Sequence, residues 1–121
     1  MTQEEKNLLL KDLCARLPYG VKYNYDGYIG CDYTMNQVDC NTVDCTFLIE
    51  SVKPYIFPLS SMTEEQIKEC LSTKHKITRS SGKDMYLDSP NTIIYYLKNH
   101  FDYNGLIPLG LAIDATDKNI Y

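Results

Sequence analysis

The sequence predicts an α+β fold in which one helix precedes a small antiparallel sheet, and two helices and a short extended tail follow it. Hydrophobic residues recur at helical spacing near both ends of the chain and alternate in between. Capping residues and prolines mark where these elements begin. The sheet is expected to have three to four strands, and a curled SH3-like barrel is the alternative arrangement. The 121 residues, 44% of them apolar, are expected to form a single domain spanning residues 1–121.

The first helix is expected over residues 2–17. Thr2 is a suitable N-cap, and Glu5 stands three residues later, where it completes a capping box. Pro18 and Gly20 end the helix. Its apolar stripe comprises Leu9, Leu10, Leu13, Cys14 and Leu17.

Residues 21–34 predict a β-hairpin, because Asp26 and Gly27 form the dipeptide that a two-residue type I′ turn prefers. Such a turn would place Tyr23 opposite Gly30. A third strand is expected over Val43–Val52. Its inward face would carry Val43, Cys45, Phe47 and Ile49.

The segment after this strand carries the most specific local pattern of the chain. Pro54 and Pro58 fix their own φ angles and push the preceding residues out of the α region, so residues 53–58 should be extended. A helix should begin immediately afterwards, because Thr63 and Gln66 form a second capping box. The segment is therefore interpreted as a rigid connection from the sheet to a helix.

The next helix is expected to run to about Thr73, and residues 74–87 are predicted as a long loop, with an additional strand inside it as the alternative. The last helix begins after Ser89, with Pro90 at the favoured first position, and ends near Asn99. A short helical turn at 106–109 and an extended piece at 111–114 should follow.

The net charge of −4 argues against general binding to nucleic acids or membrane surfaces. Charge is nevertheless uneven, because residues 51–83 carry six basic and three acidic side chains. A solvated loop explains these cations most simply. They are also candidate contacts for phosphate or for an acidic partner: Lys74, Lys76, Arg79 and Lys83.

Eleven tyrosines are unusual for this length, and several lie in the predicted hairpin. Packing across the strands is the simplest interpretation. A surface for a protein partner and a stacking platform for single-stranded nucleic acid are the alternatives. The candidate protein-binding residues are Tyr23, Tyr25 and Tyr28 on one strand face and Tyr33 on the other.

The sequence does not favour an enzyme, a cofactor or a metal site. Cys40 and Cys45 have a spacing that zinc sites use, but a second close pair is absent. The only histidines available as bases are His75, beside two lysines, and His100, where a helix C-terminus should hold imidazole protonated. The five cysteines are an odd number, and neither a signal peptide nor a membrane-spanning stretch is visible. We therefore expect a soluble cytoplasmic protein.

Three segments, residues 11–21, residues 53–65, and residues 100–108 with 110–112, resemble an uncharacterised family of small proteins found in phages and integrated elements of gut bacteria of the Bacteroides type. The resemblance implies a viral or prophage origin, and hence the host cell cytoplasm, but no activity. Phe57 and Asn104 stand where similar sequences usually carry arginine.

These three segments share prolines, glycines and aromatic residues, so we expect them to meet in space as one structural junction. Its predicted members are Tyr19, Pro54, Tyr55, Pro58, Phe101, Tyr103 and Gly105. The predicted function is that of a non-enzymatic accessory protein of phage type that binds another protein, such as a host factor. The alternative is a nucleic-acid-associated protein that uses the basic loop 74–83.

Overall fold

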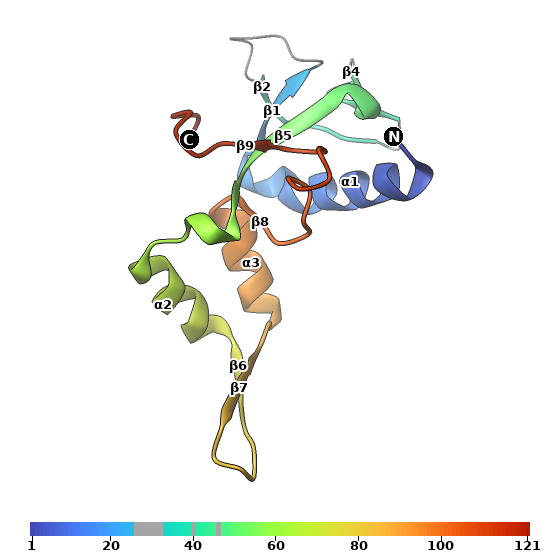
Figure 1. Ribbon diagram of the computed structural model, residues 1–121. Coiled ribbons are helices and arrows are strands. Elements are labelled where there is room, and N and C mark those ends of the chain that lie inside the picture. Colours follow the sequence, from blue (N-terminus) through green and yellow to red (C-terminus); the bar gives the residue numbers. More distant parts are fainter. Residues whose placement is uncertain (26–32, 40, 46) are drawn as a thin grey trace.

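The computed structural model describes residues 1–25, 33–39, 41–45 and 47–121. The predicted α+β class is confirmed, with α1 (Gln3–Arg16), α2 (Glu64–Thr73) and α3 (Pro90–Lys98) as its helices. Figure 1 shows α1 lying beside the strands of the main sheet, whereas α2, α3 and a long β-hairpin project away from them. We call the projecting part, residues 59–98, the lobe, and the remainder the body.

Strand β5 (Val52–Pro58) is the centre of the main sheet. The sheet has the order β2-β1-β5-β8, and β9 also pairs with β5. Its other strands are β1 (Lys22–Tyr25), β2 (Tyr33–Thr34), β8 (Phe101–Asp102) and β9 (Ile113–Asp114). The prediction that residues 53–58 are extended is confirmed, but their interpretation as a mere connection was wrong.

The prediction of an all-antiparallel sheet was also wrong. β1 runs antiparallel to β5, whereas β8 and β9 run parallel to it. Parallel neighbours need a long crossover connection, and the lobe supplies the one between β5 and β8. The pairings of the described strands form an open sheet rather than a closed barrel.

The register predicted for the first hairpin was wrong. Tyr23 pairs with Tyr33 rather than with Gly30, and the two rings stack with their centroids 5.5 Å apart. Tyr33 therefore lies on the same face as Tyr23, not on the opposite one. The predicted turn at Asp26 and the position of Tyr28 lie outside the described residues.

The predicted third strand is interrupted by a turn. β3 (Thr42–Val43) and β4 (Phe47–Leu48) form a separate antiparallel pair, and a 3₁₀ turn at Ile49–Ser51 precedes β5. Asp44 and Cys45 between them have φ angles of 53° and 58°, so Cys45 is exposed instead of facing inward. The Asp44 carboxylate accepts hydrogen bonds from the backbone of two residues before β3, which stabilises this turn.

The end of the chain completes the pairing between β1 and β5. Tyr23 pairs with Pro54, so regular pairing would place Lys22 opposite Tyr55. The Tyr121 hydroxyl bridges this position, because it accepts from the Lys22 N–H at 2.8 Å and donates to the Tyr55 carbonyl at 2.7 Å. Burial raises the pKa of Tyr121 to about 12, so the phenol keeps the proton that it donates.

The capping box of α1 is confirmed, but its buried face contains charges that the apolar pattern did not reveal. Asp12 and Arg16 are both fully buried, and the Arg16 Nε lies 2.6 Å from the Asp12 carboxylate. Arg16 also donates to the Phe101 carbonyl at 2.6 Å, and the Asn104 amide donates to Asp12 at 2.8 Å. The guanidinium lies 5.6 Å from the ring centroid of Tyr103.

These contacts bring the end of α1 together with residues 101–104, and β8 joins the same residues to Phe57 and Pro58 of β5. Of the other residues of the expected junction, Pro54 and Tyr55 are buried and Tyr19 is half-buried in the 3₁₀ turn Leu17–Tyr19. Gly105 has a φ angle of 74° in the turn after β8.

Buried hydrophobic side chains of the described residues form two clusters. The larger fills the body between α1 and the sheet and includes Leu9, Leu13, Tyr23, Val52, Ile56 and Leu106. The smaller lies between the lobe and β8 and includes Cys70, Tyr96 and Phe101. The lobe is thus packed on the body at its base.

The substitution Arg16→Met should destabilise the fold, because it leaves the Asp12 carboxylate buried without its cation. Removing one partner of a buried pair costs about 3–5 kcal/mol. The double variant Asp12→Leu with Arg16→Met should recover much of this loss, since no unpaired charge remains. Urea unfolding followed by circular dichroism measures both values, and equal losses in the single and double variants would contradict the prediction.

Candidate functional site

Exposed hydrophobic side chains concentrate on the lobe. Among the described residues, twelve large hydrophobic side chains are exposed, and seven of them lie between residues 59 and 94. A concentration of exposed apolar surface of this kind is typical of an interaction site. The seven are Leu59, Ile67, Leu71, Ile77, Tyr86, Leu87 and Ile94.

The prediction of a loop over residues 74–87 was wrong, because these residues form a β-hairpin of two strands, where the sequence left open one additional strand. β6 (His75–Thr78) and β7 (Asp84–Leu87) pair over their whole length, and Figure 1 shows them extending beyond both helices of the lobe. We call this hairpin, residues 75–87, the arm. All residues of its two strands are exposed except Met85, which is half-buried.

The two faces of the arm differ in chemistry. The register pairs His75 with Leu87 and Ile77 with Met85, so these four side chains share one face. The other face carries Lys76, Thr78, Asp84 and Tyr86. The arm therefore presents a largely apolar face and a largely polar face to its surroundings.

The tip of the arm is an ordered turn. The Arg79 N–H donates to the Lys83 carbonyl at 3.0 Å, and the Gly82 N–H donates to the Arg79 carbonyl at 2.9 Å. Gly82 has a φ angle of 81°, which favours glycine. The turn places the cations of Arg79 and Lys83 at the end of the arm that lies farthest from the body.

The root of the arm is fixed to the two helices by polar contacts. The Ser89 hydroxyl, which belongs to the confirmed N-cap of α3, donates to the Thr73 carbonyl at 2.6 Å. Thr73 in turn donates to the Thr92 hydroxyl at 3.0 Å. Lys74 and Asp88 form an ion pair at 3.2 Å across the root. These contacts hold the arm in a defined direction.

The four predicted phosphate contacts are not equivalent. Lys74 is paired with Asp88 and Lys76 with Asp84, at 3.2 and 3.3 Å. In the described part of the chain, Arg79 and Lys83 form no such ion pair, although Arg79 contacts the Met85 sulfur at 3.8 Å. The cations most available to a partner are therefore the two at the tip.

The exposed face of α2 continues the apolar surface. Its capping box at Thr63 is confirmed, but Ile67 and Leu71 are 52% and 40% exposed, and only Cys70 of the helix is buried. A shallow groove of about 220 Å³ lies between α2 and α3, where Leu71, Lys74 and Tyr96 contribute to its lining. Since Lys74 immediately precedes the arm, this groove reaches the root of the arm.

The tyrosines of the first hairpin surround an aromatic ring of the body. The Phe47 ring lies 4.3 Å from that of Tyr25 and 5.1 Å from that of Tyr33, between ring centroids. Tyr23 is fully buried, and its hydroxyl donates a hydrogen bond to the Asp44 carboxylate at 2.5 Å. The prediction that Tyr23 contacts a protein partner at the surface was therefore wrong. Burial raises the pKa of Tyr23. Tyr33 remains 38% exposed.

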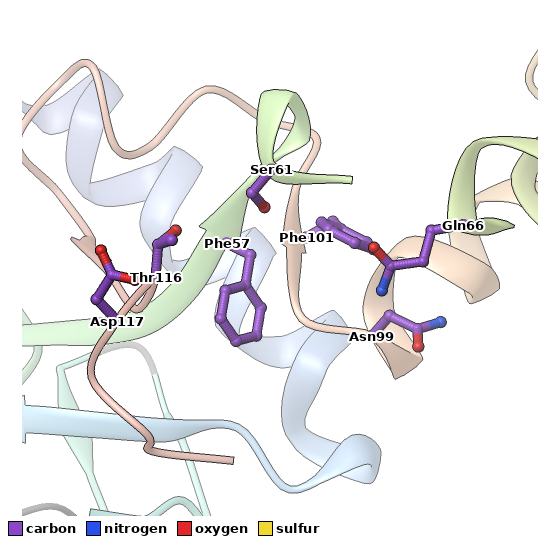
Figure 2. A pocket seen from close by; sticks show the side chains of 7 residues that line it. All are labelled: Phe57, Ser61, Gln66, Asn99, Phe101, Thr116 and Asp117. Atoms are coloured by element: carbon purple, nitrogen blue, oxygen red, sulfur yellow. The ribbon is translucent and has the colours of Figure 1, made fainter. Parts of the chain in front are cut away.

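A cleft of about 240 Å³ lies beside Phe57, at the boundary between the body and the lobe (Figure 2). Two phenyl rings and several neutral polar side chains line it, and Asp117 is the one ionisable group among its described lining residues. A single carboxylate provides no acid–base pair. The lining comprises Phe57, Ser61, Gln66, Asn99, Phe101, Thr116 and Asp117.

His100 follows α3 and stacks on Tyr121, with the ring centroids 3.7 Å apart. The expectation that the helix end keeps this imidazole protonated was wrong. Burial and the nearby charges of Arg16 and Lys22 lower the pKa of His100 to about 4. Its Nδ1 atom is buried without a hydrogen-bond partner in the described structure, so His100 is neutral at pH 7.

The described residues contain no group of three His, Cys, Asp or Glu side chains placed to hold a metal ion, while Cys40 lies outside them. Within the same part of the chain, no helix has the length and apolar character needed to cross a membrane. No protein-family model, curated protein or solved structure matches this chain.

The variant His100→Asn should lose less of its free energy of unfolding in acid than the wild type does. The pKa of His100 is about 4 when folded and near 6.5 in its ordinary state, so the unfolded chain binds the proton first as pH falls. Stability is then lost between pH 6.5 and 4. Asparagine does not titrate there and tolerates the left-handed conformation, in which His100 has a φ angle of 60°.

The measurement compares the free energy of unfolding at pH 7 and pH 5 for both proteins, so that the contribution of the carboxylates cancels. The wild type should lose more stability than the variant. Equal losses would show that His100 is not held neutral.

Proposed function

We propose that this chain is a non-enzymatic protein that binds another protein, and that the arm and the exposed face of α2 form the contact surface. One observation carries the proposal: three of the four side chains on the largely apolar face of the arm are exposed to solvent, and the fourth, Met85, is half-buried. An isolated two-stranded hairpin is only marginally stable in water. Contact with a partner would bury Ile77 and Leu87, which are 39% and 45% exposed.

The chemistry of the surface indicates what the partner should present. The apolar face of the arm requires an apolar strip, and the cations of Arg79 and Lys83 at the tip favour carboxylates beside it. Because the root is already ordered by Ser89 and Thr73, binding does not require the arm to fold. Such preorganisation reduces the entropic cost of association.

The resemblance of three segments to small proteins of phages and integrated elements supports a further part of the proposal. We assign the chain an accessory role in such an element, acting in the cytoplasm of the host cell with a host protein as one class of partner. The exposed ring of Tyr33 is a secondary candidate contact on the body, and Tyr25 contributes to its packing.

Binding to nucleic acid is the second candidate function. A two-stranded ribbon has the dimensions of the DNA major groove, and the tip carries two cations without ion pairs in the described structure. The ion pairs of Lys74 and Lys76 reduce the number of available phosphate contacts. Binding to duplex DNA that weakens steeply with salt, and that Arg79→Ala with Lys83→Ala removes, would favour this function over the first.

The double substitution Ile77→Ser with Leu87→Ser should abolish capture of the protein partner from a lysate of the source cells, measured by affinity purification and mass spectrometry. Truncation of a central apolar contact costs about 2 kcal/mol or more, so two together cost about 4 kcal/mol and should weaken binding by roughly 1,000-fold. Leu109→Ser is the matched control, since Leu109 is 51% exposed on the body. Capture that survives the double substitution, or is lost equally in the control, would argue against the arm.

A further inference from the structure

We propose that the arm binds a second copy of this chain, in a two-fold symmetric dimer in which each arm lies along α2 of the other copy. The inference rests on the proposed function, because it names the partner of the same surface. In a two-fold dimer each copy contributes the same patch, so the patch must be complementary to itself. The lobe meets this requirement through the spacing and the charge of its exposed residues.

The apolar residues of the two elements have matching spacing. Ile67 and Leu71 are four residues apart on α2, about 6 Å along the helix axis. On the arm, Leu87 and Ile77 occupy rungs two residues apart on one face, about 7 Å along the strand. When an arm lies antiparallel to α2, Leu87 therefore falls beside Leu71 and Ile77 beside Ile67.

The same alignment brings opposite charges together. Beyond Ile77 the arm ends in Arg79 and Lys83, and beyond Ile67 the helix begins with Glu64 and Glu65. All four of these charged side chains are exposed. Each element thus presents two apolar residues followed by two charges, positive at the tip of the arm and negative at the start of α2, although α2 also carries the exposed Lys68 beside Ile67.

The arm cannot make this contact within its own chain. It continues beyond the C-terminal end of α2 and points away from the helix (Figure 1), so its tip and the N-terminus of α2 lie at opposite ends of the lobe. The contacts that fix the root, such as the hydrogen bond from Ser89 to Thr73, hold it in that direction. In the two-fold dimer, the tip of the arm of one copy lies beside the N-terminus of α2 of the other copy.

Charge reversal tests the inference by sedimentation velocity, with the chain mass of 13.9 kDa as the reference for a monomer. The wild type should form a dimer at low salt. Two variants, Arg79→Glu with Lys83→Glu and Glu64→Lys with Glu65→Lys, should each weaken dimerisation at least tenfold, because the arm and α2 then carry like charges. The milder variant Glu64→Gln with Glu65→Gln, which keeps the capping box, should weaken it less.

An equimolar mixture of the two reversed variants should restore the dimer. In the mixed pair, the reversed arm meets the reversed helix, and the unaltered arm meets the unaltered helix. A wild type that remains monomeric from 10 to 300 micromolar protein, variants that dimerise as the wild type does, or a mixture that stays monomeric would each overturn the inference. A monomeric wild type that still captures another protein in an Ile77-dependent manner would overturn the dimer alone and leave the proposed function in place.

Discussion

The buried ion pair of α1 determines where the rest of the chain can lie. A guanidinium removed from water needs close partners for its charge, and Arg16 donates to Asp12 and to the carbonyl of Phe101, while its Nη1 atom is buried without a hydrogen-bond partner in the described structure. Phe101 is thereby held beside the end of α1, where its strand pairs in parallel with Phe57. The lobe is the connection between these two strands, so its direction depends on the same pair.

The elements that the sequence predicted correctly are those specified by neighbouring residues. Helix starts at Thr2, Thr63 and Ser89 each depend on a side chain that reaches a backbone N–H three residues away. The hairpin register failed because it depends on distant packing: Tyr23 and Tyr33 are aligned by the ring of Phe47, which comes later in the chain. Local turn preference does not contain that information.

The hairpin structure of the arm was partly predictable from the sequence, but the exposure of its apolar side chains was not. Ile77 on one strand and Met85 and Leu87 on the other alternate with polar residues around Gly82, which is a hairpin pattern that the basic residues obscured. Ile67 lies at helical spacing from the buried Cys70, and periodicity identifies an apolar face without saying what covers it. For the same reason, Arg16 four residues after Asp12 has the pattern of a surface ion pair.

The crossover between β5 and β8 also carries the exposed apolar surface of the lobe. A parallel pair of strands requires a connection that leaves the sheet and returns to it, so β5 and β8 would need a segment such as the lobe even without a partner. That segment is packed at its base by Cys70, Tyr96 and Phe101, and its far end makes little contribution to the core. The arm is therefore free to carry exposed residues such as Ile77 at little cost to the fold. This separation explains how one short chain keeps a stable body while presenting an uncovered apolar face.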